Sequence, residues 1–291
     1  MNFFKRKYNQ LFTKYFKYFG SDIQFVESYY KSKNNRLLNL KNPIEFTEKL
    51  QWLKLFKYTE AYKNYVDKYE IRSYVKDKIG DAYLNDFIAI YNHVNDINLD
   101  DLPNQFALKG THGSGYNVIV KDKSSLDWQD AKSKLSKFMS LNYYDRYRER
   151  IYKDVQPRIL AEKYLDQLDN DHIIDYKFYC IHGKPVCIWV KTFDSGKHRN
   201  CYYDLNWNRM SPDNNNVDYL SKEVPKPDNL EDLLRVSEKL ANDFIFVRVD
   251  LYSIENKIYF GELTFFPWAA NRRLTVERLN KELGDLIQLP V

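Results

Sequence analysis

Charged side chains lie close together on two neighbouring segments near the C-terminal end of the sequence. Arg248 and Asp250 belong to VRVDLYSI, and Glu262 and Thr264 belong to IYFGELTFF. Both segments alternate β-branched or aromatic residues with polar ones, and the polar stretch IENK separates them, which predicts a β-hairpin. Because successive strand residues point to opposite faces, Arg248 and Asp250 share one face, and a simple register brings Glu262 beside Asp250.

Two carboxylates side by side leave two interpretations open. Without a cation they repel each other and one of them stays protonated, whereas a divalent ion that prefers oxygen ligands removes the conflict. Alternatively, Arg248 neutralises Asp250 and Glu262 as a structural ion cluster. From these residues alone, the hairpin predicts either a site for a metal and a phosphate or a structural set of charges.

The glycine-rich stretch KGTHGSG, residues 109–115, is the second group of residues that could do chemistry. Short apolar segments flank it, which predicts a strand, a loop and a second strand. Gly113 and Gly115 allow a ligand to approach the backbone, whose N–H groups can bind phosphate oxygens, and Lys109 adds positive charge. The lysine precedes the glycines and a strand follows them, which is not the order of a Walker A loop. A flap over nucleotide phosphates fits better, and an ordinary glycine-rich hairpin turn is the alternative.

The composition is that of a globular protein without a strong charge bias. The chain has 291 residues, of which 29% are charged and 44% hydrophobic, and its formal net charge is +5. This balance does not indicate nucleic-acid binding. Cys180, Cys187 and Cys201 lack the spacing of a zinc site or a disulfide framework, which favours a reducing cytoplasm. No run of 18 apolar residues is present, so no membrane-spanning segment is predicted.

The first 20 residues predict a basic helix with an aromatic stripe. They contain five Lys or Arg and no acid, and apolar side chains recur at helical spacing at Phe4, Tyr8, Leu11, Tyr15 and Phe19. Such a helix either lies on the anionic inner face of a membrane or packs its stripe on the protein body and leaves its lysines in water.

The order of the predicted elements favours an α+β fold with largely antiparallel sheets. Residues 1 to about 90 are expected to be helical, as are residues 124–150 and LEDLLRVSEKLAND. Strands are expected around the glycine-rich stretch, at ILAEKYL, in the hairpin DYKFYCIHGKPVCIWVKTF and in the charged hairpin. A helical region followed by strands interleaved with helices is typical of α+β proteins.

Several of these motifs, in this order, resemble the ATP-grasp family, and specifically its TupA-like branch, which is associated with bacterial surface polysaccharide and teichuronopeptide synthesis. RVD and ELT resemble the Arg-x-Asp and Glu-x-Asn of the family, and FALKGTHGSG resembles its lysine strand and glycine flap. VDKY, AEKYL and DYKFYC resemble its other nucleotide-binding segments, and FTEKLQWLK resembles a helix of the branch.

The resemblance implies an ATP-grasp fold, in which two α+β subdomains with antiparallel sheets enclose a nucleotide. It predicts a helical N-terminal region at residues 1–60 and an ATP-grasp domain at residues 61–291. Within that domain, the glycine flap is expected in residues 80–160 and the metal and phosphate residues in 161–291. The implied cofactors are ATP and Mg²⁺.

The resemblance also implies an activity, that of an ATP-dependent carboxylate-amine ligase that forms an acyl phosphate. Arg248 is the implied catalytic residue, because its charge would stabilise the developing oxyanion. The implied ATP-binding residues are Lys68, Lys109, Gly113, Ser114, Gly115, Glu162, Asp175 and Lys177, and the implied metal ligands are Asp250, Glu262 and Thr264. An amino acid, a uronic acid or an amino sugar would be the substrates, in surface polysaccharide or glycopeptide synthesis.

The sequence departs from the family pattern in two places. Thr264 stands where many ATP-grasp enzymes have Asn, and a hydroxyl is a poorer magnesium ligand than an amide oxygen. Residues 1–60 are expected to be helical, where these ligases usually have a Rossmann-like domain, so the acceptor pocket does not carry over. Candidate substrate contacts are His112 in the flap and Asn271 and Arg272, which follow FPW.

Two other classes of function stay open at this point. One is a glycosyltransferase or another polysaccharide-processing enzyme. The other is a protein that keeps the ATP-grasp fold and binds a nucleotide or a glycan without catalysis, which the threonine at position 264 keeps in play.

Overall fold

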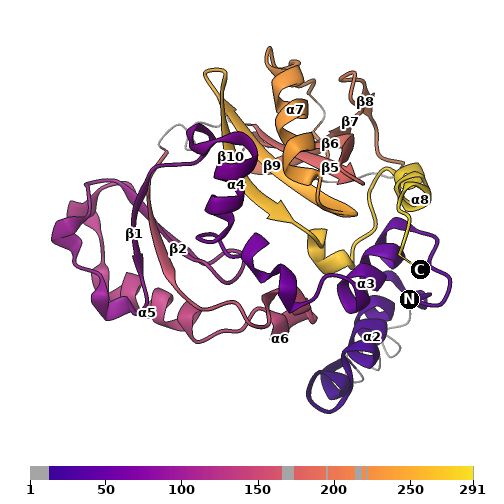
Figure 1. Ribbon diagram of the computed structural model, residues 1–291, viewed down its shortest axis with the longest axis horizontal. Coiled ribbons are helices and arrows are strands. Elements are labelled where there is room, and N and C mark those ends of the chain that lie inside the picture. Colours follow the sequence, from indigo (N-terminus) through magenta and orange to yellow (C-terminus); the bar gives the residue numbers. More distant parts are fainter. Residues whose placement is uncertain (1–12, 166–173, 195, 214–217, 221, 291) are drawn as a thin grey trace.

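Two antiparallel sheets form the framework of the protein (Figure 1). The computed structural model describes residues 13–165, 174–194, 196–213, 218–220 and 222–290. The smaller sheet lies at one end of the molecule, and the larger sheet lies beside it with the N-terminal helices near its other side (Figure 1). This arrangement confirms the predicted α+β class with antiparallel sheets.

The smaller sheet has the strand order β1-β4-β2-β3. Its strands are β1 (Phe87–Tyr91), β4 (Ile159–Lys163), β2 (Phe106–Gly110) and β3 (Asn117–Val120). The glycine-rich loop joins β2 to β3, and Lys109 pairs with Asn117 beside it. The predicted strand, loop and strand are therefore confirmed.

The larger sheet has the strand order β10-β9-β5-β6-β7-β8. Its strands are β10 (Lys257–Thr264), β9 (Phe246–Ile254), β5 (Asp175–Ile181), β6 (Lys184–Asp194), β7 (Lys197–Tyr203) and β8 (Arg209–Met210). In the hairpin of β9 and β10, Glu262 pairs with Asp250, as the alternation of side chains predicts. The predicted hairpin of β5 and β6 also forms, and both residues of its turn, His182 and Gly183, have positive φ, which two-residue hairpin turns favour.

Helices cover the sheets and form the N-terminal part of the protein. They are a helix over residues 13–19, α2 (Asp22–Asn34), α3 (Phe46–Phe56), α4 (Ile71–Ile79), α5 (Trp128–Met139), α6 (Tyr144–Tyr147), α7 (Leu230–Ala241) and α8 (Glu277–Leu286). Short 3-10 turns connect them, among them η1 (Glu60–Tyr65), η6 (Arg150–Tyr152) and η8 (Pro267–Ala270). None of the described helices combines the length and apolar character that crossing a membrane requires.

Each sheet has its own hydrophobic core. Under the larger sheet, Phe178, Val249 and Leu233 belong to one cluster that also takes in residues of α3. In the smaller sheet, Phe106 packs with Leu135 of α5 in a separate cluster. Because apolar burial stabilises each half separately, the space between the two sheets can stay polar.

The sequence prediction differs from the structure before residue 90. That stretch was expected to be helical, whereas FIAIY forms β1, which pairs with β4. β-branched and aromatic residues favour a strand once a partner is present, and the partner here comes from a distant part of the chain. The aromatic stripe predicted for residues 1–20 falls partly outside the described residues. Its described part, residues 13–19, is helical, and Tyr15 and Phe19 are exposed there.

Replacement of Gly284 by alanine should destabilise the contact between α8 and the start of α3. A Cβ atom at this position would lie 2.2 Å from the carbonyl oxygen of Ile44 and 2.9 Å from the nitrogen of Phe46. Both neighbours are backbone atoms, so we expect the free energy of unfolding to fall by about 1–3 kcal/mol in urea titrations. Asp285→Ala on the same helix is the control and should change it by less than about 0.5 kcal/mol. Equal losses in the two variants would contradict this prediction.

Candidate active site

Three neighbouring strands of the larger sheet bring the predicted charged residues together. Lys177 of β5 pairs with Asp250 of β9, and Asp250 pairs with Glu262 of β10. Side chains directly opposite each other on antiparallel strands share one face of the sheet. Lys177 Nζ lies 2.5 Å from Asp250 Oδ2 and 2.6 Å from Asp175 Oδ2. Lys177 therefore links β5 to β9 through its ion pair with Asp250.

Arg248 binds Asp250 at two points. Its Nε lies 2.7 Å from Asp250 Oδ1 and its Nη2 lies 2.7 Å from Asp250 Oδ2. Asp250 is only 1% exposed. Burial alone would raise the pKa of Asp250, but Arg248 and then Lys177 outweigh burial and lower it. Burial alone would lower the pKa of Lys177, but the charges of Asp250, Asp175 and Glu262 together outweigh burial and raise it. Asp250 stays ionised and fixes both cations.

Thr264 bridges Arg248 and Glu262. Its hydroxyl accepts a hydrogen bond of 2.9 Å from Arg248 Nη2 and donates one of 3.2 Å to Glu262 Oε1. The Glu262 side chain is 45% exposed, so its carboxylate remains open to a ligand. The two carboxylates therefore differ, because Asp250 is held in a buried ion cluster while Glu262 reaches the solvent.

Magnesium fits this set of oxygen atoms with Glu262 as its most accessible protein ligand. No group of three or more His, Cys, Asp or Glu side chains is arranged to hold a metal ion in the described part of the chain. Mg²⁺ often binds through one or two carboxylates together with phosphate oxygens and water, so such a group is not required. Both oxygens of Asp250 already accept hydrogen bonds from Arg248 or Lys177.

Trp189 of β6 forms the floor beneath the two cations. The Arg248 guanidinium lies 5.5 Å and the Lys177 ammonium 5.9 Å from the centroid of its ring. Trp189 pairs with Lys177 across the strands and also packs against Trp268, with ring centroids 4.9 Å apart. Cations over an indole ring are attracted to its negative face, which further restricts where these two side chains lie.

On the smaller sheet, Glu162 gathers two cations. Lys109 Nζ lies 2.7 Å from Glu162 Oε2, and Arg72 Nη1 lies 3.2 Å from Glu162 Oε1. Lys109 and Glu162 come from β2 and β4, and Arg72 comes from α4. The side chain of Lys109 is 30% exposed, so its ammonium can also reach a ligand between the sheets.

Lys68 holds the glycine-rich loop in place. Its Nζ donates a hydrogen bond to the Gly113 carbonyl oxygen, and its backbone N–H donates to the Thr111 carbonyl oxygen. Burial lowers the pKa of Lys68, although Glu262 acts in the opposite direction. The loop has little room at Gly113, where a Cβ atom would lie 2.5 Å from the Tyr116 ring, and Gly115 has a φ of +79°. Both glycines are thus needed for the loop to take this form.

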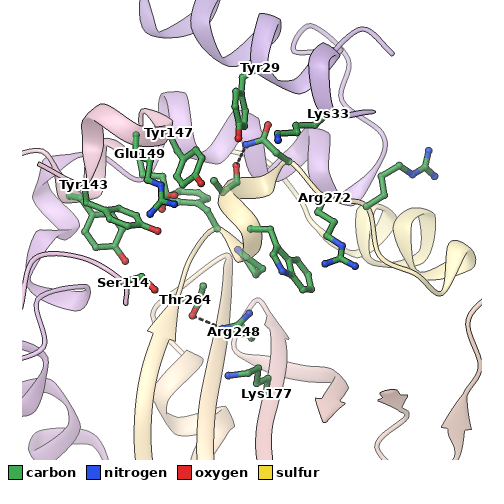
Figure 2. Close-up of a pocket in the computed structure, with 18 of the residues that line it drawn as sticks. Tyr29, Lys33, Ser114, Tyr143, Tyr147, Glu149, Lys177, Arg248, Thr264 and Arg272 are labelled. Carbon is green, nitrogen blue, oxygen red and sulfur yellow. Dashed lines mark hydrogen bonds between the residues drawn. The ribbon is translucent and has the colours of Figure 1, made fainter. Parts of the chain in front are cut away.

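Two cavities meet at these residues. One, of about 430 Å³, lies between the sheets and is lined by Lys68, Lys109, Gly115, Glu162, Asp175 and Asp250, among others. The other, of about 720 Å³, is lined by α2, α6, η8 and the ends of β9 and β10 (Figure 2). Five side chains line both cavities: Ser114, Tyr152, Lys177, Lys191 and Glu262. The charged residues of the larger sheet therefore stand where the two cavities join.

A left-handed turn forms part of the wall of the larger cavity. Trp268, Ala269 and Ala270 in η8 have φ values of 51°, 55° and 57°. This conformation costs roughly 1–2 kcal/mol for each residue with a side chain. Buried polar groups of α3 hold it: Gln51 Nε2 donates to the Ala270 carbonyl oxygen at 3.0 Å, and Lys54 Nζ donates to that of Ala269 at 3.3 Å.

The three candidate substrate contacts have different surroundings. His112 is buried, its Nε2 lies 2.9 Å from the Phe138 carbonyl oxygen, and it lines a separate cavity. Burial lowers its pKa. Asn271 and Arg272 both line the larger cavity. The Asn271 side chain is fixed by the backbone of η8 and by Gln51, whereas Arg272 is exposed.

Several lining residues were not predicted from the sequence. Trp189 and Lys191 could have been, because the two-residue alternation of β5 and β6 puts both on the same face of the sheet as Lys177. Glu149 and Tyr152 come from the irregular chain around α6 and η6, where no local pattern indicates which side chains turn inward.

The fold and this arrangement of charges define an ATP-grasp protein, and comparison with known families agrees. The family described as TupA-like ATPgrasp matches residues 48–288, so the chain belongs to the TupA-like ATP-grasp family. This assignment confirms the family and the fold that the motifs predict. A comparison with curated protein sequences gives no significant match.

Solved structures with a similar course of the chain include three ligases of low sequence identity. D-alanine-D-alanine ligase from Helicobacter pylori is 18% identical, with 84% of this chain and 69% of that chain covered and a TM-score of 0.45. D-alanine–D-alanine ligase from Bacillus anthracis complexed with ATP is 14% identical over 70% of this chain and 54% of that one, with a TM-score of 0.41. The ATP-grasp ligase PsnB complexed with its minimal precursor, Mg and ADP is 11% identical over 83% and 66%, with a TM-score of 0.40.

Replacement of Asp250 by asparagine should strongly destabilise the protein, because Arg248 and Lys177 would stay buried without their shared counter-charge. We expect a loss of about 3–5 kcal/mol in the free energy of unfolding, measured in urea at pH 7. The folded-state pKa of Asp250 is lowered, so its contribution is present above about pH 4 and is lost as the pH falls further. This loss at acid pH should be smaller in Asp250→Asn. The control Asp232→Asn breaks an exposed pair with Arg235 and should cost less than about 1 kcal/mol. A similarly small cost for Asp250→Asn would contradict the assigned role.

Proposed function

We propose that this protein is an ATP-dependent ligase that joins a carboxylate to an amine through an acyl phosphate. The observation that carries the proposal is the junction of two cavities at Lys177, Lys191 and Glu262, with Arg248 beside it in the larger cavity. A ligase of this type must bring the γ-phosphate of ATP to a second substrate, and a shared boundary lined with cations is suited to that transfer.

The cavity between the sheets is the proposed ATP site. Lys68, Lys109 and the backbone of residues 113–115 would bind phosphates from the side of the smaller sheet. Lys177 would neutralise phosphate charge from the larger sheet, while Glu162 and Asp175 orient the lysines and contact the nucleoside. Magnesium would be held by Glu262 together with phosphate oxygens and water, with Asp250 and Thr264 beside it.

The proposed reaction has two steps. An oxygen of the substrate carboxylate attacks the γ-phosphorus and ADP leaves, which forms the acyl phosphate. The nitrogen of the amine then attacks the carbonyl carbon, the carbon–oxygen bond to phosphate breaks, and the amide forms as the nitrogen loses its proton. Arg248, already fixed by Asp250, would stabilise the negative oxygen that develops on that carbon. Bound magnesium would neutralise charge on the phosphates.

The larger cavity is the proposed site for the carboxylate and the amine. Its walls carry aromatic rings suited to the flat faces of sugars, including Tyr29, Tyr147 and Trp268. Arg272 at its rim, and Asn271 to a smaller extent, would meet an anionic group. These features support an amino acid, a uronic acid or an amino sugar as substrate, and a role in bacterial surface polysaccharide or glycopeptide biosynthesis.

A location at the inner face of the membrane is a further part of the proposal. In the helix of residues 13–19, Tyr15, Tyr18 and Phe19 are 57%, 67% and 77% exposed. Lys14 directly precedes Tyr15, and Lys17 directly precedes Tyr18. Exposed aromatic rings next to lysines favour contact with anionic lipid headgroups.

The first test is calorimetry of ATP binding with and without Mg²⁺. The parent protein should bind ATP more tightly with Mg²⁺, and Glu262→Gln should lose most of this dependence, because the amide is a weaker ligand for a hard cation. Glu255→Gln, in the exposed turn of the same hairpin, is the matched control and should behave like the parent. A parent that does not bind ATP would overturn the proposal. Binding without ADP release in a screen of carboxylates and amines would favour the non-catalytic alternative.

The membrane contact has its own test, flotation with vesicles that contain anionic lipid. The full chain should float with these vesicles, and a variant without residues 1–20 should not. A variant with Tyr15, Tyr18 and Phe19 replaced by serine keeps the lysines and should bind more weakly, since apolar burial and charge act together. No difference between the full chain and the truncated chain would exclude this role for the N-terminal segment.

A further inference from the structure

Glu149 has an unusual environment for a carboxylate. It directly precedes η6 as its N-cap residue, it is only 5% exposed, and it lines the larger cavity. Among the residues that the structure describes, none forms a hydrogen bond or an ion pair with its carboxylate. A buried charge without a partner costs free energy, so such a group indicates a missing ligand.

Lys54 is the buried cation whose charge acts on Glu149, but its ammonium group makes hydrogen bonds to other groups. Lys54 Nζ donates to the carbonyl oxygens of Tyr147 and Ala269, each at 3.3 Å. Burial raises the pKa of Glu149 to about 7, and the charge of Lys54 acts against this rise. Within the described ranges, the hydroxyls of Tyr143 and Tyr152 also interact electrostatically with Glu149. The oxygens of Glu149 are therefore available to a cation in the cavity.

The charges that line the larger cavity also favour Glu149 as the site for a cation. Its described lining carries many cations: Lys33, Arg146, Lys177, Lys191, Arg248, Arg272 and Arg273. In that described lining only Glu149 and Glu262 are acidic. Glu262 is bonded to Thr264 and lies 3.6 Å from Arg248, at the end where the phosphates are placed. Glu149 is thus the acid that remains for a positively charged part of the substrate.

The position of Glu149 suits a nitrogen that must reach the carbonyl carbon of an acyl phosphate. In Figure 2, Glu149 and Tyr147 lie above the strands that carry Arg248 and Thr264. Tyr152 lines both cavities, and its pKa is raised by burial and by the charges of both Glu149 and Glu262. An amine beside Glu149 would therefore lie in the same cavity as Tyr152 and Glu262, which also line the proposed ATP site.

We infer that Glu149 is the residue that binds the ammonium group of the second substrate, and that this substrate is a primary amine. The inference rests on the proposed ligase function. It names Glu149 as the residue that would make the site select an amine over a hydroxyl compound. Only the ionised carboxylate attracts an ammonium ion. Binding of the amine should thus strengthen as the pH rises through the pKa of Glu149 and should lower that pKa.

The test uses the full-length protein labelled with [13Cδ]glutamate and followed by NMR. The signal of Glu149 is identified by its loss in Glu149→Gln. D-glucosamine is the cationic probe, and N-acetyl-D-glucosamine is its neutral counterpart. We expect D-glucosamine to shift the Glu149 signal and to lower its pKa by about 1, because an opposite charge stabilises the carboxylate. The neutral sugar should leave the signal in place.

Two controls separate this inference from the proposed function. Glu149→Gln should keep the magnesium-dependent ATP binding of the parent and lose D-glucosamine binding, since the amide is close in size to the acid. Asp145→Asn, an exposed change on α6, should keep both. A Glu149 signal that responds to neither sugar, or equally to both, would overturn the assignment. Loss of ATP binding in the parent would overturn the ligase function alone, because the amine titration is done without nucleotide.

Discussion

The site depends on one constraint, which is that Asp250 must remain ionised although it is buried. Removal of a carboxylate from water is costly, and the cost is offset only because Arg248 and Lys177 both bind it. Lys177 lies on β5, and Arg248 and Asp250 lie on the adjacent strand β9. The register between these two strands therefore decides whether the three charged groups meet. A slip by one residue would turn each of these side chains to the other face.

The wall opposite this cluster is held by a second set of buried polar groups. The left-handed residues of η8 place their carbonyl oxygens toward α3, where Gln51 and Lys54 donate to them. The hydrogen bonds between the two elements offset both the strain of the turn and the burial of the two polar side chains. The helix that opens the ATP-grasp segment thus shapes a cavity wall more than two hundred residues away in sequence.

The sequence allowed the hairpins and their charges to be predicted, because those features depend on local alternation and on turn residues. The pairing of Asp250 with Glu262 follows from a period of two, and the β5–β6 turn from His182 and Gly183. Strand β1 could not be found this way, because only its distant partner β4 makes it a strand. The sequence alone favours Lys54 as a solvated residue of an amphipathic helix. Its burial follows from its hydrogen bond to a carbonyl group of η8, which the sequence does not indicate. ATP-binding and metal roles for the individual residues stay predictions.

The five side chains that line both cavities have a thermodynamic consequence. A ligand in one cavity would contact Lys177, Lys191 and Glu262, which also line the other cavity, and would so change the affinity of that cavity for its own ligand. Such coupling is reciprocal: if nucleotide strengthens binding of the second ligand by some factor, the second ligand strengthens nucleotide binding by the same factor. If ATP binds between the sheets as proposed, its affinity would therefore also report whether the neighbouring cavity is filled.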